Sequence, residues 1–167
     1  MYYLFIVFVD TLNQNEEVNM IKVEFGDMPP QAFMLGLLSA FDNRFQACAD
    51  RLFQEITWKQ FFAIICVKIC KEKPTINELS EVMGSSHQNV KQILLKLESK
   101  GFVSMIPDKE DRRKQRIVLT KRCVDFCENN DVQSQEIIWK IFDGIDEEQL
   151  VNAIKTVMQM ERNISDL

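Results

Sequence analysis

Apolar residues recur at every third or fourth position along most of this 167-residue chain, which is the spacing of helices that bury one face. The first such stretch begins at Pro29-Pro30, a pair suited to the first turn of a helix, and continues to about Ile56. Its stripe is wide and rich in phenylalanine, so it faces either an ordinary core or a second chain. Residues 58–70 are apolar on nearly every side and follow a candidate N-cap, Thr57, so they predict the central buried helix.

Two shorter helical patterns follow, separated by a turn. Thr75 precedes Glu78 at the spacing of a capping box, and Gly84 breaks the first pattern before Ser86, the expected N-cap of the second. The residues expected to face the core are Ile76, Leu79, Val82, Val90, Ile93, Leu94 and Leu97. Gly101 ends the second helix, because glycine readily adopts the left-handed conformation found after helix C-termini.

Two strand-like runs, residues 102–106 and 115–119, come next, and the charged segment 107–114 joins them as a protruding hairpin. A short helix, a turn, a second helix and a basic hairpin in this order form a winged helix-turn-helix. Apolar stripes after the hairpin predict two more helices, with Thr120 and Asp146 as their N-caps. We therefore expect a mainly α fold with a small β-wing. Its expected parts are an N-terminal extension (1–29), flanking helices (30–57 and 121–167) and the winged helix-turn-helix domain (58–120).

The N-terminal extension contains two extended-looking runs, residues 2–9 and 19–25, on either side of a polar loop. Three interpretations stay open: a β-hairpin, a loosely attached extension, or a natural start at Met20. None of them suggests a function.

The composition is that of an ordinary globular protein, with 46% hydrophobic and 27% charged residues. The five cysteines are odd in number and most lie among apolar neighbours in helical segments, which favours reduced thiols in a cytoplasmic protein. No apolar run reaches the roughly 18 residues of a membrane span. The N-terminus lacks the basic residues and the cleavage pattern of a signal peptide. We therefore expect no membrane partner.

Charge is distributed unevenly along the chain. The net charge is −5, yet residues 71–122 hold 12 Lys and Arg against 7 Asp and Glu. A basic middle within an acidic protein indicates one face built for an anionic partner such as double-stranded DNA.

The second helix of the winged helix-turn-helix carries polar side chains opposite its apolar stripe. The candidates for DNA contact on this helix and just before it are Ser85, Ser86, His87, Gln88, Asn89, Lys91, Gln92 and Lys96. An α-helix fits the major groove with its first turns nearest the base edges, and a helix start can hold a phosphate. Because Asn and Gln pair bidentately with adenine, an A·T-containing site is indicated. A plain solvent-exposed helix face is the alternative.

The hairpin carries the densest basic charge. Arg112 and Arg113 lie at its expected tip, where arginines can enter the narrow, electronegative minor groove of A·T-rich DNA. Asp111 is unexpected in a loop that faces phosphates, and we expect it to orient one of these arginines by a charge-assisted hydrogen bond. The further cations expected to contact phosphates, and so to make binding salt-dependent, are Lys109, Lys114 and Arg116. A solvated charged loop is the alternative.

Three groups of residues occur together here: the segment ELSEVMGSSHQNVKQILLKLESKGFV, then Asp108 with Asp111-Arg112-Arg113, then Leu119-Thr120. Together they resemble the helix-turn-helix and the wing signature of the MarR family of bacterial transcriptional regulators. The resemblance covers about residues 30–167 and is strongest over 58–120. It departs at Cys123, where the family often has glycine.

The resemblance implies a homodimeric transcriptional repressor in which the flanking helices 30–57 and 121–167 are the dimerisation helices. It would bind a pseudo-palindromic operator with helix 86–99 in the major groove and the wing 107–116 in the minor groove. Similar proteins respond to small aromatic ligands or to oxidants. The residues that could line a ligand pocket are Phe45, Phe53, Trp58 and Phe62. Core packing is the favoured interpretation of these residues, and also of Cys48, the thiol nearest the helix junction.

Two other classes of function fit the sequence less well. A winged-helix module that contacts proteins and binds no DNA is the alternative, although the basic wing argues against it. An enzyme is not expected, because the chain has no CxxC pair, no His–Cys–Asp arrangement and no Gly-rich phosphate loop. The single histidine, His87, does not suit a metal site, and no cofactor is expected.

Overall fold

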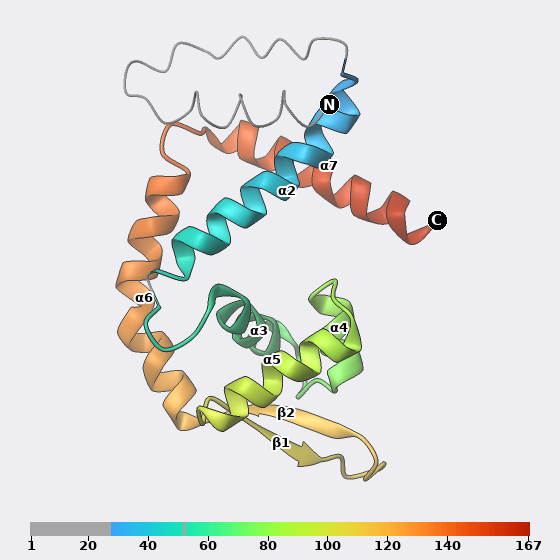
Figure 1. The fold of residues 1–167 in the computed structure, drawn as a ribbon, viewed down its shortest axis with the longest axis vertical. Helices are drawn as coiled ribbons and strands as arrows, with labels where there is room; N and C mark the ends of the chain where they lie inside the picture. Colours follow the sequence, from blue (N-terminus) through green and yellow to red (C-terminus); the bar gives the residue numbers. More distant parts are fainter. Residues whose placement is uncertain (1–27, 52) are drawn as a thin grey trace. The chain divides into compact units, whose positions relative to one another are not determined.

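The computed structural model describes residues 28–51 and 53–167. Its elements in chain order are α2 (Pro30–Ala49), α3 (Trp58–Ile69), α4 (Ile76–Val82), α5 (His87–Ser99), β1 (Val103–Pro107), β2 (Gln115–Leu119), α6 (Lys121–Ile141) and α7 (Glu147–Ser165). The expected mainly α fold with a small antiparallel wing is confirmed (Figure 1). The chain divides into two compact units, Met1–Cys48 and Ala49–Leu167. The predicted N-terminal hairpin lies outside the described residues.

Helix α2 begins at Pro30, as predicted, but it ends at Ala49 rather than near Ile56. Phe53 and Ile56 continue the helical spacing in the sequence, but they lie in a non-helical connector. Their side chains are 8% and 2% exposed and pack into the core of the second unit. The large apolar residues of α2 that stay exposed are Leu35, Leu37 and Phe41. The apolar spacing therefore predicted one long helix where the protein has a helix followed by a connector with buried side chains.

One hydrophobic core holds the winged helix together. Its largest fully buried side chains are Phe102, Ile64, Leu79, Leu94, Leu97, Ile117, Val90, Val103, Cys66 and Cys123. They come from α3, α4, α5, both strands and the first turn of α6, with Phe102 lying just before β1, and the first three of these helices also pack on one another. Full burial of one such aliphatic side chain contributes about 1.5–3 kcal/mol, so this core fixes how the helix-turn-helix and the wing are placed.

Side-chain caps set the start of every helix in the second unit. In each case a hydroxyl or carboxylate oxygen accepts a hydrogen bond from the backbone N–H three residues on. The cap residues are Thr57, Thr75, Ser86, Thr120 and Asp146. All five confirm the sequence predictions, and Thr75 and Glu78 form the expected capping box. Each such cap typically contributes about 1 kcal/mol.

One prediction for α4 is wrong. Val82 does not face the core and is 46% exposed, although Ile76 and Leu79 are buried as expected. The inward positions of this seven-residue helix are continued by Ser80 and then by its C-cap Met83, which packs against the core. Met83, four residues after Leu79, therefore takes the inward-facing position, and Val82 just before it points to solvent.

The wing is an antiparallel hairpin whose base is tied to the helices. Its facing pairs run from Val103↔Leu119 to Pro107↔Gln115. The Ile117 N–H donates to the Pro74 carbonyl at 2.9 Å, and the Thr120 hydroxyl donates to the Gly101 carbonyl at 2.6 Å. Gly101 has a φ of +74°, which provides the left-handed turn between α5 and β1. The hairpin is thereby held beside α5 with its far end projecting (Figure 1).

Helix α6 is packed at its start and exposed farther on. Cys123 is fully buried, and the ring of Phe126 meets that of Phe102 edge-on at 5.1 Å. Helix α7 has no buried residue. The large apolar residues of these two helices that stay exposed are Val124, Val132, Ile138, Trp139, Val151, Ile154, Met158 and Ile164. Within the described part of the chain, no helix is both long enough and apolar enough to cross a membrane.

Candidate nucleic-acid interface

Helix α5 buries one face and exposes a polar one. Its buried stripe is Val90, Ile93, Leu94 and Leu97, as predicted. The candidate contact residues on the helix are all exposed, namely His87, Gln88, Asn89, Lys91, Gln92 and Lys96. A polar partner can therefore approach this face without disturbing the core.

The turn before α5 orders the first residues of that face. Gly84 has a φ of +58°, and the Ser86 hydroxyl caps the helix by accepting from the Asn89 N–H at 3.3 Å. The Asn89 side chain also donates through Nδ2 to the Ser85 hydroxyl at 2.8 Å. This bond leaves the carboxamide oxygen and one N–H of Asn89 to face a ligand, which is the pair that adenine matches in the major groove.

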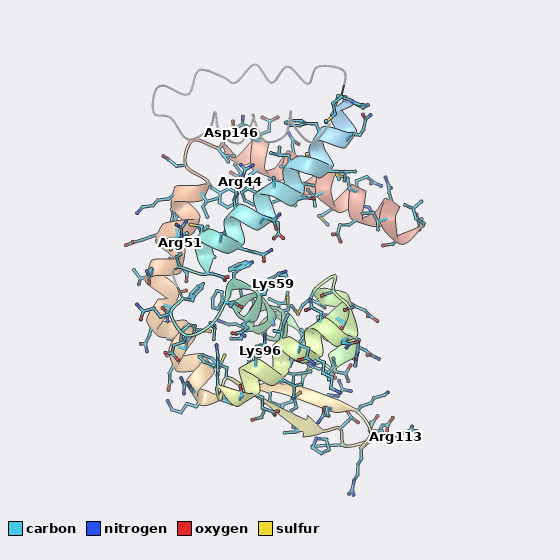
Figure 2. All side chains as sticks on the ribbon, viewed as in Figure 1. Arg44, Arg51, Lys59, Lys96, Arg113 and Asp146 are labelled. Carbon is cyan, nitrogen blue, oxygen red and sulfur yellow. The ribbon has the colours of Figure 1, made fainter. Side chains whose placement is uncertain are left out.

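The wing tip presents its cations to solvent in an ordered arrangement. Asp111 accepts from Arg113 Nε at 3.0 Å and from Nη2 at 3.3 Å, so the expectation that it orients an arginine is confirmed. Hydrogen bonds from the side chain and backbone of Arg113 hold the pKa of Asp111 below its usual value. The Arg113 side chain remains 91% exposed at the far end of the hairpin (Figure 2). The other tip cations, all exposed, are Lys109, Arg112 and Lys114.

Arg116 differs from the other cations of the wing. A contact with phosphate was predicted for it, but its guanidinium is bound to groups of the protein itself. Its side chain is only 29% exposed and turns toward the protein. Nε donates to Asp108 Oδ2 at 2.5 Å, while Nη1 donates to the Lys73 carbonyl at 2.9 Å and to Glu78 Oε2 at 3.2 Å. The sequence did not reveal this cluster, because 38 positions separate Glu78 from Arg116 and no periodic pattern links them.

A cleft of about 470 Å³ lies between α5, the start of α4 and the wing. Its lining residues are Thr75, Ile76, Asn77, Glu78, His87, Lys91, Arg113, Lys114, Gln115 and Arg116. Four of them are Lys or Arg and one is Glu, and because Arg116 is paired with Glu78 and Asp108, the positive charge of the cleft comes from Lys91, Arg113 and Lys114. Its charge and its position between a helix face and a wing suit an anionic backbone.

A second cleft of about 880 Å³ lies between the connector before α3 and the first half of α6. Two ion pairs contribute to its lining, Arg122–Glu55 at 2.6 Å and Lys121–Asp125 at 2.9 Å. Because these pairs cancel most of its charge, the cleft has no strong preference for an anion or a cation.

The aromatic residues considered for a ligand pocket line neither of these two clefts. Phe53 packs against Phe61 at 4.5 Å, in the core. Trp58 stacks with Phe62 at 6.2 Å, and both pack against the same core. Phe45 belongs to the other unit, where it stacks with Phe41. These contacts support core packing for Phe53, Trp58 and Phe62.

The buried thiols are poorly suited to sensing. Burial raises the pKa of Cys66, and burial together with the neighbouring Cys127 raises the pKa of Cys123 to about 12. A thiol with a raised pKa is a weak nucleophile. Cys48 is the exposed cysteine among the described residues. Residues 28–51 and 53–167 contain no group of three or more His, Cys, Asp or Glu side chains that could hold a metal ion.

Residues 56–114 match the sequence model of the MarR family. The winged helix of this chain is therefore similar in sequence to the MarR family. The match begins just before the Thr57 cap and ends at Lys114, so it includes α3, the helix-turn-helix and the wing tip.

Solved structures of MarR-type regulators have a similar fold. A MarR/EmrR family regulator from Acinetobacter sp. ADP1 aligns with a TM-score of 0.74 and 13% identity, covering 84% of this chain and 100% of that one. The S. aureus MepR–DNA complex aligns with a TM-score of 0.69 and 18% identity, covering 77% and 95%. BpsR of Bordetella bronchiseptica, whose DNA binding is regulated by 6-hydroxynicotinic acid, aligns with a TM-score of 0.66 and 17% identity. The alignment covers 75% of this chain and 91% of BpsR. At these identities the likeness establishes the fold.

Proposed function

We propose that this protein is a transcriptional regulator that binds duplex DNA, with α5 in the major groove and the wing tip in the adjacent minor groove. The observation that carries the proposal is the basic cleft that lies between the polar face of α5 and the exposed wing arginine Arg113. A duplex that fills both grooves places its phosphate backbone between these two elements. MepR, a protein of the same fold, has been crystallised with DNA.

Each part of the interface has a separate role in this proposal. His87, Gln88, Asn89 and Gln92 would contact base edges, and the Asn89 amide held by Ser85 suits adenine. Arg112 and Arg113 would enter the minor groove, where A·T pairs narrow it and strengthen its negative potential. The residues that would contact phosphates are Ser85, Ser86, Lys91, Lys96, Lys109 and Lys114.

We further propose that the active form is a homodimer. The apolar residues that α2, α6 and α7 leave exposed are numerous enough to form an interface with a second copy. Two copies related by a twofold axis would place two α5 helices about 34 Å apart, one turn of DNA, on a pseudo-palindromic site. Such a regulator would work in the cytoplasm, beside the chromosome.

The mode of control that we propose is repression relieved by a small aromatic ligand or an oxidant. BpsR offers the precedent of a ligand that regulates DNA binding. In a dimer, any signal that changes the separation of the two α5 helices would weaken binding, because both must reach one face of the duplex.

The proposal is tested by selecting genomic DNA fragments bound by the purified protein. We expect enrichment of fragments that share a pseudo-palindromic, A·T-containing site. Ser86→Ala removes the N-cap of α5 and serves as a weakened variant, which should enrich the same fragments less strongly. If no fragment is enriched and no salt-sensitive duplex binding is found at micromolar protein, the chain is instead a winged-helix module for protein contact.

A further inference from the structure

Arg116 connects three parts of the winged helix that are far apart in the sequence. It lies in β2, where its backbone pairs with Ile106 of β1 on one side and forms a bridge with Thr75 on the other. Its guanidinium reaches the Lys73 carbonyl and the Glu78 carboxylate at the start of α4. The same group donates to Asp108, the first residue after β1.

Asp108 in turn shapes the wing tip. Its Oδ1 accepts from the backbone N–H groups of Glu110 at 2.8 Å and Asp111 at 2.9 Å, while its own N–H donates to the Lys114 carbonyl at 2.9 Å. Asp108 is only 9% exposed, so these bonds are partly shielded from water. Asp111, placed by this turn, holds the Arg113 guanidinium through two hydrogen bonds.

A continuous series of charge-assisted contacts thus runs from the capping box of α4 to the wing-tip arginine. We propose that Arg116 is a positioning residue, which anchors Asp108 to the start of α4 and so holds Arg113 at a fixed separation from α5. The proposal rests on the DNA-binding function above, because the separation matters only if both elements reach one duplex. Preordering of the two elements reduces the conformational entropy lost on binding.

The charges of the cluster fit an internal anchor better than a phosphate contact. Two carboxylates, Glu78 and Asp108, already neutralise Arg116. The hydrogen bond from Arg116, followed by those from the Asp111 and Glu110 N–H groups, holds the pKa of Asp108 well below its usual range. The bond to Asp108 also raises the pKa of Arg116. The pair therefore stays ionised throughout the neutral pH range.

If Arg116 positions the wing, one substitution should weaken DNA binding. If Arg116 instead contacts phosphate directly, the same substitution should strengthen it. Asp108→Asn removes a negative charge near the DNA, so electrostatics alone predict tighter binding. If Arg116 is an anchor, the same change weakens binding, because the amide nitrogen cannot accept from Arg116 while the remaining oxygen can still accept from the backbone. Arg116→Lys separates the two roles again, since lysine keeps the charge but lacks the planar fork that spans several partners.

The experiment measures the affinity of the full-length chain for a selected duplex at one salt concentration. We expect Asp108→Asn, Arg116→Gln and Arg116→Lys each to bind roughly 5- to 30-fold more weakly, the coupling expected within one hydrogen-bond network. Asp125→Asn is the matched control, because it also removes one acid of an ion pair but lies in α6, and its affinity should stay near that of the parent. Binding by Asp108→Asn that equals or exceeds the parent's, or parental affinity in Arg116→Lys, would overturn the proposal.

Amide hydrogen exchange gives a readout that needs no DNA. The N–H groups of Glu110, Asp111 and Lys114 should exchange faster in Arg116→Gln and in Asp108→Asn, because the turn loses its anchor even where its acceptor oxygen is kept, while those of the α5 interior stay protected. Unchanged exchange at the tip would show that Arg116 does not anchor the wing. If the parent binds no duplex, the proposed function fails, and the exchange data still decide whether the anchor exists.

Discussion

Helices α5 and α7 are both amphipathic, but their apolar faces have different surroundings. In α5 the apolar stripe is buried, with Val90 and Leu94 fully covered by the core of the winged helix. In α7 no residue is buried, and Ile154 and Met158 are about half exposed. The comparison shows that apolar periodicity predicts which side of a helix will be covered, but not whether the same chain covers it. The winged helix has its own core, whereas the apolar face of α7 stays exposed.

The largest expected effect comes from matched truncations in the two helices. Leu94→Ala should lower the free energy of unfolding by about 2–5 kcal/mol, because it removes a fully buried side chain and leaves a cavity. Ile154→Ala should cost a dilute single chain much less, since that side chain is 48% exposed. Urea denaturation at low protein concentration measures both. Equal losses would contradict the contrast between the two helices.

The second largest effect is expected from a single wing arginine, and it should change DNA affinity without changing the fold. Arg113→Ala should weaken binding of the selected duplex by about 1–3 kcal/mol while leaving the helical circular dichroism unchanged. Lys155→Ala in α7 removes the same charge from an exposed site outside the winged helix. Fluorescence anisotropy with both variants checks this. Equal losses of affinity would mean that net charge, rather than the wing, governs binding.

The exposed apolar face of α6 should matter for assembly instead. Trp139 is 77% exposed in the single chain, so Trp139→Ala should not unfold the protein. It should weaken self-association by more than about 1 kcal/mol if this tryptophan is central to the dimer interface. Sedimentation equilibrium measures the effect, with the neighbouring Lys140→Ala as control. A parent that stays monomeric at high concentration would refute the proposed dimer.

The smallest expected effect is a dependence of the wing on acid. The pKa of Asp108 is lower in the folded state than in the unfolded state, where it is about 3.9. The ionised carboxylate therefore stabilises the folded protein at pH values above about 3.9, and this stabilisation is lost progressively as the pH falls below that value. The thermal midpoint of the parent should exceed that of Asp108→Asn at pH 7, and the two should converge below about pH 4. A difference that persists or grows in acid would mean that the ion pair is not its source.

Local signals in the sequence were sufficient for the helix starts. Each N-cap is a Ser, Thr or Asp whose hydrogen bond closes within three residues, so Thr57, Thr75 and Ser86 could be predicted without tertiary structure. The buried stripe of α5 and the Asp111–Arg113 pair are short-range features of the same kind. Most of the winged helix could therefore be predicted from the sequence.

The features that the sequence could not supply depend on long-range contacts. The end of α2 at Ala49 was missed, because Phe53 and Ile56 continue a helical spacing while a connector carries them into the core. Arg116 was grouped with the phosphate-binding cations, because its partners Glu78 and Asp108 are brought to it only by the fold. A charged residue in a basic loop does not show from sequence alone whether it faces DNA or anchors the loop.

We propose that the winged helix binds duplex DNA through its basic cleft and wing. The most direct test is the affinity of the purified protein for its own upstream DNA, measured by fluorescence anisotropy over a range of salt concentrations. We predict that the logarithm of the association constant falls linearly with the logarithm of salt concentration, with a slope of about −0.9 for each phosphate neutralised. Absence of measurable duplex binding at micromolar protein, or binding that does not change with salt, would contradict the claim.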